Sequence, residues 1–278
     1  MPDWKYYNHA AVPITPPHQT PDLTPLENGE LWRLGGHRPL LARWTTEFDC
    51  GHDTNWWYVI KDTPFDIAEL KAKRRYEINK GIKNFDVRVI DPSLYKQELY
   101  DVQVAALSAY PPKYRPTVDR QAFFSSIDGW TQYVILGGFS RDSDQLCGYA
   151  LLAQESEAYV DFKVLKTHPA QERNGINAAL VYGVLLHFRS MLLDGGYICD
   201  GARSINHETE FQNYLEKYFG FRKAYCKLHI SYNPALKWAI PLLFRCRKVW
   251  LKLDGVGVVH QLNAVLTMEE IARERKSL

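Results

Sequence analysis

The stretch most able to do chemistry lies between residues 158 and 180, where a strand-like segment leads through a turn into a helix start. The turn is His168-Pro169-Ala170, and the helix start carries Gly175 among polar residues. The first N–H groups of a helix lack partners and its dipole favours negative charge, so this place could hold a phosphate. A glycine among polar residues at a helix start is also a common capping arrangement, so both interpretations stay open.

The elements that must position this segment form one ordered series. Alternation, helical spacing and the breaker Pro111-Pro112 predict strands at 85–90, 131–138, 145–154, 157–166, 197–200 and 222–232, with helices at 93–109, 117–128, 172–193 and 208–218. The polar run 140–144 is typical of a hairpin loop. In order this is β-α-α-β-β-β-α-β-α-β, which predicts a mixed α+β domain.

Composition excludes several classes of protein. The 278 residues are 46% hydrophobic and 24% charged, with a net charge of +2, so disorder and binding to nucleic acid through overall charge are not indicated. The five cysteines are widely spaced without a C-x-x-C pair, so we expect no disulfide framework, no metal site and a reducing compartment. The N-terminal residues lack a secretion-signal pattern, and we expect a cytoplasmic protein without integral membrane contact.

The flanking regions are predicted to be extensions of the central domain. Residues 12–25 are rich in proline and predict an extended arm, and a strand near 56–60 precedes a basic helix over 65–83. For that helix we favour a solvated face over a binding surface. Residues 234–253 are basic and apolar, interrupted by Pro241; we favour packing on the main domain over peripheral membrane contact. The predicted boundaries are therefore 1–83, 84–232 and 233–278.

The order of elements over 84–232 resembles the GNAT N-acyltransferase superfamily, which implies a twisted mixed sheet flanked by helices. In that family the fourth strand splays from the fifth and offers backbone groups to pantetheine, and the loop before the third helix wraps the coenzyme A pyrophosphate. The resemblance assigns cofactor binding to Val164, Leu165, Lys166, Arg173, Asn174, Gly175, Ile176, Asn177 and Ala178. Glu172 stands where the family prefers Gln or Arg, and Asn177 where it prefers Gly or Ala.

A second segment, from Ser204 to Phe221, resembles the family's Asn-led helix that ends in a Gly-Phe pair. In the family a tyrosine on this helix protonates the departing thiolate, which requires a phenol near the thioester sulfur. The resemblance therefore implies catalytic roles for Tyr214, Tyr218 and Asn206, although tyrosines on an amphipathic helix are often packing residues.

Attack by an amine also requires a base, or a chain of waters, so that the nitrogen is neutral. Asp161, His207 and Glu208 have suitable side chains, and each has an equally ordinary structural interpretation. None of the cysteines lies in a recognisable nucleophile setting, which favours direct attack over a covalent intermediate.

Upstream, Trp56 to Ile60, Phe65-Asp66 and residues 73–83 resemble the lead-in to the second GNAT half of Fem-type aminoacyl transferases. The sequence therefore predicts an N-acyltransferase that moves an acyl group from acyl-CoA, most simply acetyl-CoA, to a small-molecule or peptide amine. Two alternatives remain: a transferase that takes its group from aminoacyl-tRNA, indicated by the basic helix, and a GNAT-fold binding protein without catalysis, indicated by Glu172.

Overall fold

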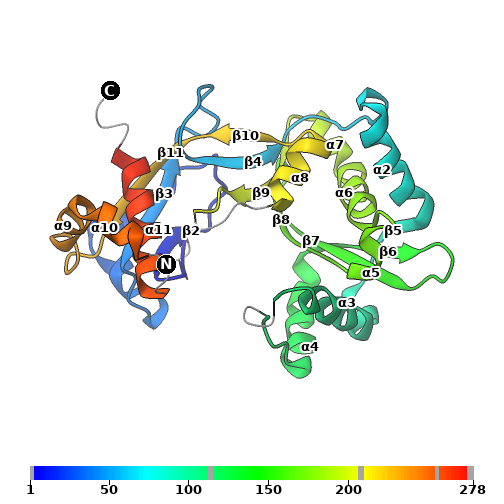
Figure 1. Cartoon of the computed structure of the whole chain (residues 1–278), viewed down its shortest axis with the longest axis horizontal. Helices are drawn as coiled ribbons and strands as arrows, with labels where there is room; N and C mark the ends of the chain where they lie inside the picture. Colours follow the sequence, from blue (N-terminus) through cyan, green and yellow to red (C-terminus); the bar gives the residue numbers. More distant parts are fainter. Residues whose placement is uncertain (1–2, 112–114, 206–209, 254–256, 274–278) are drawn as a thin grey trace. The chain divides into compact units, whose positions relative to one another are not determined.

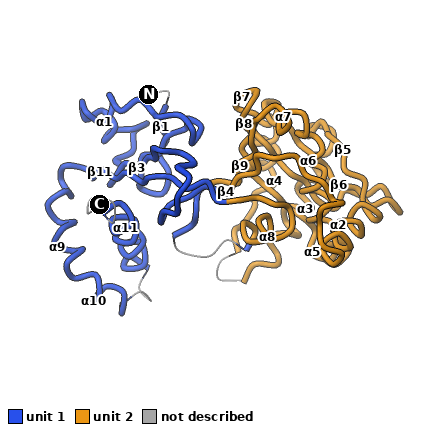
Figure 2. Tube along the Cα trace, turned by 90° about the horizontal axis from the view of Figure 1, so that it is seen from above, with its two compact units in different colours: residues 1–58, 202–210, 223–278 blue, residues 59–201, 211–222 orange. Residues whose placement is uncertain are grey.

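The computed structural model describes residues 3–111, 115–205, 210–253 and 257–273 (Figure 1). By contacts between Cα atoms the chain forms two compact units (Figure 2). The first comprises residues 1–58, 202–210 and 223–278, and the second comprises residues 59–201 and 211–222. Each unit is built from segments that are distant in the sequence.

A seven-stranded mixed sheet forms the framework of the second unit. Its strands, in spatial order, are β10 (Arg222–Tyr225), β4 (Trp57–Lys61), β9 (Tyr197–Ala202), β8 (Tyr159–Thr167), β7 (Leu146–Ser156), β6 (Val134–Ser140) and β5 (Phe85–Val89). The strands from β5 to β8 pair antiparallel, and β8 pairs with β9 parallel. This is the expected mixed α+β, GNAT-like arrangement.

Two predicted elements differ in the sheet. Residues 222–232 form two strands and not one: β10 ends at Tyr225, and β11 (Lys227–Tyr232) pairs with β3 (Leu41–Thr46) in a different sheet. The break falls at buried Cys226, whose N–H donates to the carbonyl of Trp56. The second difference is β4, which comes from the predicted N-terminal extension and lies between β9 and β10.

Helices cover the sheet. The bounds are α2 (Ala72–Asn84), α3 (Lys96–Ser108), α4 (Arg120–Asp128), α5 (Pro169–Glu172), α6 (Ile176–His187), α7 (Arg189–Leu193) and α8 (Glu210–Phe219). The predicted helix 172–193 is therefore divided, and that over 65–83 is shortened to α2 after a single 3₁₀ turn at Ile67–Glu69. Leu99, Val102 and Ile127 fill one core with Tyr149, whereas Ile176 and Leu180 pack α6 against Phe85.

The first unit contains a four-stranded sheet in the order β1 (Trp4–Tyr7), β2 (Ala10–Pro13), β3 and β11. Its helices are α1 (Thr24–Glu27), a 3₁₀ segment (Glu30–Gly36), α9 (Ala239–Arg245), α10 (Arg247–Lys252) and α11 (Gly257–Arg273). The proline-rich arm leaves β2 at Pro13, and the Trp4 indole Nε1 donates to the Asp22 carbonyl at 2.9 Å. Within the described ranges, every helix is too short or too polar to cross a membrane.

Candidate active site

Strands β8 and β9 pair over only three residues of each strand, and we call the region where the pairing has ended the wedge. They pair only at Tyr159 with Tyr197, Val160 with Ile198 and Asp161 with Cys199, although β8 continues to Thr167. On its other side β8 stays paired with β7, with a bulge at Lys163. The backbone of β8 beyond Asp161 therefore has one edge that is not bonded to β9, which is the splay implied by the GNAT resemblance.

Asp200 lies on β9 just past the last pair with β8, where the wedge opens. Burial raises the pKa of its carboxyl to about 7, a hydrogen bond from the Gln212 side chain opposes this shift, and the negative charge of Asp161 adds to it. Gln212 is buried on α8, and its side chain forms a hydrogen bond with the Asp200 carboxyl. A carboxyl with a pKa near neutrality can take a proton from a bound nucleophile and release it afterwards.

Asp161, a base candidate from the sequence, pairs with Cys199 on β9, the residue that precedes Asp200. Its carboxylate pairs with Lys163 of the same strand, and Lys163 also lies 3.9 Å from Glu155. Asp161 thus carries a compensated negative charge, while its field favours the protonated form of Asp200. Asp200 is therefore a candidate base, and Asp161 is a neighbour whose charge acts on it.

Cys199, between the two aspartates, is fully buried. Its sulfur accepts a hydrogen bond from the Gly201 N–H at 3.3 Å, and burial raises the pKa of the thiol. Burial also raises the pKa of the Cys147 thiol. Both remain protonated near neutral pH and are poor nucleophiles, which agrees with direct attack rather than a cysteine-linked intermediate.

The three predicted strand residues, Val164, Leu165 and Lys166, lie on the part of β8 that has left β9. They are half-buried, and the ammonium of Lys166 lies 5.8 Å from the centre of the Tyr110 ring. Their backbone faces the wedge, so their position fits a role in holding an extended substrate group. That role itself stays a prediction.

The predicted phosphate loop, Arg173 to Ala178, forms the start of α6. Gly175 is its N-cap with a φ of +90°, a left-handed conformation that favours glycine. Thr167 at the end of β8 donates its hydroxyl to Asn177 Oδ1 at 2.8 Å, which ties the loop to the wedge. Gly175, Ile176 and Ala178 are buried, whereas Arg173 and Asn174 are exposed.

Helix α2 is what buries this loop. A Cβ atom at Gly81 would lie 2.5 Å from the Gly175 carbonyl oxygen, so the two backbones are in direct contact. Lys80 Nζ donates to the Arg173 carbonyl at 2.5 Å, and Asn84 Nδ2 to the Asn174 carbonyl at 2.9 Å. The predicted pyrophosphate loop is therefore packed against α2.

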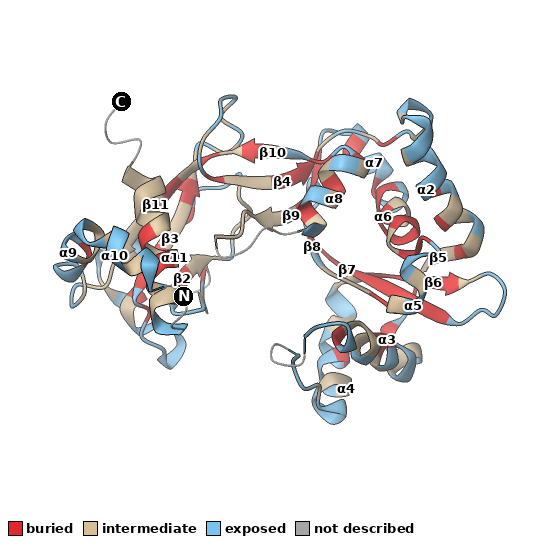
Figure 3. Ribbon diagram, viewed as in Figure 1, coloured by how far each residue is buried: buried red, intermediate tan, exposed pale blue. Residues whose placement is uncertain are grey.

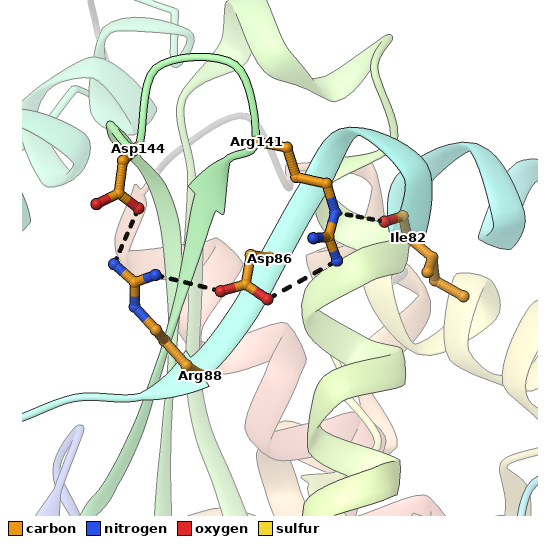
Figure 4. Close-up of polar contacts among 5 residues, drawn as sticks. All are labelled: Ile82, Asp86, Arg88, Arg141 and Asp144. Atoms are coloured by element: carbon orange, nitrogen blue, oxygen red, sulfur yellow. Dashed lines mark hydrogen bonds and ion pairs between the residues drawn. The ribbon is translucent and has the colours of Figure 1, made fainter.

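The C-terminal end of α2 is anchored by a network of charges (Figure 4). Arg141 Nε donates to the Ile82 carbonyl at 3.1 Å, and its guanidinium lies 3.8 Å from Asp86. The Arg88 guanidinium forms two ion pairs, one with Asp86 at 3.2 Å and one with Asp144 at 3.0 Å. Each of these partly exposed pairs is weak. The hydrogen bond from Arg141 to the Ile82 carbonyl ties the last turn of α2 to the turn that follows β6.

Tyr214 and Tyr218 lie on α8 with their rings 5.0 Å apart. Burial raises the pKa of the Tyr214 phenol, and the charges of Tyr218 and Glu77 raise it further. Tyr218 contacts the guanidinium of Arg74 at 6.0 Å. Both tyrosines therefore border α2, and Phe211, stacked on Tyr214, connects them to Phe162 on β8.

Asn206, the third predicted catalytic residue, lies outside the described residues, as do His207 and Glu208. Sequence reasoning missed Asp200, Gln212 and the role of Gly81. An Asp-Gly pair directly after the apolar run 197–199 is a local signal for a carboxylate at a strand end. Nothing local marks Gln212 or Gly81, because their partners are far away in the sequence.

Comparisons with known proteins support the fold. The structure of L-PGS from Bacillus licheniformis is 12% identical, covers 86% of this chain and 83% of its own, and has a TM-score of 0.52. The C-terminal domain (DUF2156) of a putative lysylphosphatidylglycerol synthetase from Agrobacterium fabrum is 11% identical, with coverages of 85% and 82% and a TM-score of 0.53.

No protein-family model matches the sequence, and no curated protein matches it. At these low identities the two solved structures show that the fold is shared over most of both chains, and they show no more than that.

Proposed function

We propose that this protein is an acyl-group transferase that takes an aminoacyl group from aminoacyl-tRNA and transfers it to a nucleophilic acceptor. The observation that supports the proposal is the contact of Gly81 with Gly175, which packs the basic helix α2 against the loop that the GNAT resemblance assigns to coenzyme A phosphates. The predicted acyl-CoA donor is the competing proposal.

The charge on α2 supports a nucleic-acid donor. Lys71, Lys73 and Arg75 are exposed at the start of the helix, and Lys83 is exposed at its end. Such cations hold phosphates without reading sequence. The name of one similar structure describes the synthesis of an aminoacylated lipid, which supports an aminoacyl group as the group transferred.

In the proposed reaction, Asp200 accepts the proton of the acceptor's amine or hydroxyl as it attacks the ester carbonyl. Gln212 keeps the carboxyl oriented, and the unpaired edge of β8 binds the extended part of a substrate. The new acyl bond forms as the ester C–O bond breaks, and the leaving oxygen takes up a proton. Tyr214, if its predicted catalytic role holds, supplies that proton.

Donor choice can be tested without knowing the acceptor. We expect no binding of coenzyme A in calorimetry at about millimolar concentration, and retention of tRNA on filters at low salt that falls steeply as salt rises. The triple variant Lys71→Glu, Lys73→Glu, Arg75→Glu should lose retention by about tenfold or more.

The matched control changes three exposed cations of the first unit, Lys5→Glu, Arg33→Glu and Arg38→Glu, and should retain tRNA like the wild type. Tight binding of coenzyme A would return the donor to acyl-CoA. Absence of tRNA retention at low salt would eliminate the tRNA donor.

Tyr214→Phe tests the predicted proton donor. If the phenol protonates the leaving group, turnover should fall by about 10²-fold while donor affinity and melting temperature stay nearly unchanged. A purely structural hydroxyl would instead cost about 1 kcal/mol of stability and leave turnover intact. Tyr218→Phe, on the same helix and beside Arg74, is the control.

A further inference from the structure

Parts of α9 and α10 are exposed (Figure 3), and the exposed residues of this region include large apolar ones. Trp238 is 87% exposed and Leu242 is 68% exposed, and Val249 and Leu251 are each 57% exposed. Exposed apolar residues are ordinary when scattered, but here four fall within 14 residues of sequence. This concentration indicates a surface that meets something apolar.

The inner side of the same helices packs against α11. Ile240 of α9 and Leu266 of α11 are buried, Asn263 Nδ2 donates to the Trp250 carbonyl at 3.0 Å, and Arg247 forms an ion pair with Glu270. These contacts are with α11 of the same unit, whereas the sequence predicted packing on the central domain. Pro241 sits in the first turn of α9, where its missing N–H is not needed.

The exposed apolar residues are accompanied by positive charge. Residues 234–253 contain no Asp or Glu, and their cations are Lys237, Arg245, Arg247, Lys248 and Lys252. Trp238, Leu242 and Arg245 are spaced by four and three residues, which places them on one face of α9. A second copy of this chain would present the same charge and would be repelled.

A shallow hollow of about 530 Å³ lies among these cations. It is lined by Pro241, Phe244, Arg245, Arg247, Lys248 and Arg273. The Arg273 guanidinium lies 4.3 Å from the centre of the Phe244 ring, and that of Arg247 lies 5.2 Å from it. Arg247 and Arg273 form ion pairs with Glu270 and Glu269 of α11. Arg245 and Lys248 also line the hollow and are exposed, so they can meet a phosphate group.

We infer that this face docks on the surface of an anionic lipid bilayer. Trp238 and the aliphatic side chains enter the interface, while the cations hold lipid phosphates, the arrangement of an interfacial amphipathic surface. Nucleic acid would use the cations but would gain nothing from Leu242, Val249 and Leu251. The inference concerns the first unit alone and does not rest on the proposed function.

Sedimentation with vesicles tests it. We expect the full chain to bind vesicles of phosphatidylcholine and phosphatidylglycerol (3:1) at 0.1 M salt, and to bind pure phosphatidylcholine at least about tenfold more weakly. Trp238→Ala with Leu242→Ala should lower affinity for the anionic vesicles by about tenfold. Lys248→Glu with Lys252→Glu should lower it by about 25-fold or more, since each cation near such a surface contributes roughly fivefold.

The matched control replaces two exposed leucines of the second unit, Leu94→Ala and Leu193→Ala, which are 74% and 61% exposed. It should bind like the wild type. Failure of the wild type to bind anionic vesicles, or equal binding by the Trp238/Leu242 variant, overturns the inference. Release of bound protein from vesicles by excess tRNA that competes through Lys248 and Lys252 would assign the face to nucleic acid instead.

Discussion

Asp200→Asn is expected to lower the transfer rate by about 10³-fold, because the substitution removes the group that accepts the acceptor's proton. With a pKa of about 7, the wild-type carboxyl is the base only when ionised, so the rate should rise with pH and level off above neutrality. Rates measured from pH 5 to 9 test this. A pH-independent residual rate is expected in the variant.

Asp161→Asn is the matched control, one strand away. Removing its negative charge lowers the pKa of Asp200, so the rise in rate should move to lower pH while the plateau changes little. If Asp161→Asn abolishes transfer and Asp200→Asn does not, the two roles are reversed.

The same pKa has a consequence for stability that needs no substrate. The folded pKa of Asp200 lies above the usual value for an unfolded aspartate, so the folded state holds the proton more tightly between about pH 4 and 7. Stability from this group is fully present below that window and is lost as pH rises through 7. Asp200→Asn should therefore raise the melting temperature at pH 8 relative to wild type by more than at pH 4.

Gly81→Ala is expected to lower the melting temperature substantially, by the equivalent of about 3 kcal/mol or more, although alanine is the better helix former. The new Cβ would lie 2.5 Å from the Gly175 carbonyl oxygen and 2.9 Å from the Ala179 nitrogen, both backbone atoms that cannot rotate away. Thermal unfolding followed by circular dichroism measures the loss.

Gly129→Ala is the control for this effect, since a Cβ there would meet nothing within 4 Å and its φ is −83°. Gly175→Glu should also disrupt the α2–α6 contact, because its Cβ would lie 2.9 Å from the backbone of Gly81. An unchanged melting temperature in Gly81→Ala would mean that α2 is not held against α6.

The order of elements from residue 85 onward could be predicted because local signals carry it. Alternating apolar residues mark β5 to β8, and Pro111-Pro112 separates the helices. The division of 222–232 could not, since residues 222–232 alternate without a local breaker and only the pairing of β11 with β3 separates them. Pairing between strands that lie more than 100 residues apart in the sequence produces no periodic pattern in that sequence.

The candidate site divides in the same way. The loop around Gly175 and the splayed strand were found through their motif and position. Asp200 was not found, because its raised pKa depends on burial and on the charge of Asp161 on the neighbouring strand. The packing of the loop against α2 depends on Gly81, which lies 94 residues earlier in the chain.

The placement of β4 between β9 and β10 bears on how the protein is synthesised. Strand β4 leaves the ribosome before its two neighbours in the sheet, which begin at residues 197 and 222. Its apolar residues therefore remain unpaired until most of the chain has been synthesised. Such non-local pairing slows folding, and the waiting strand is an aggregation hazard. A fragment of residues 84–232 would lack this strand, so β9 and β10 would lose the neighbour that joins them.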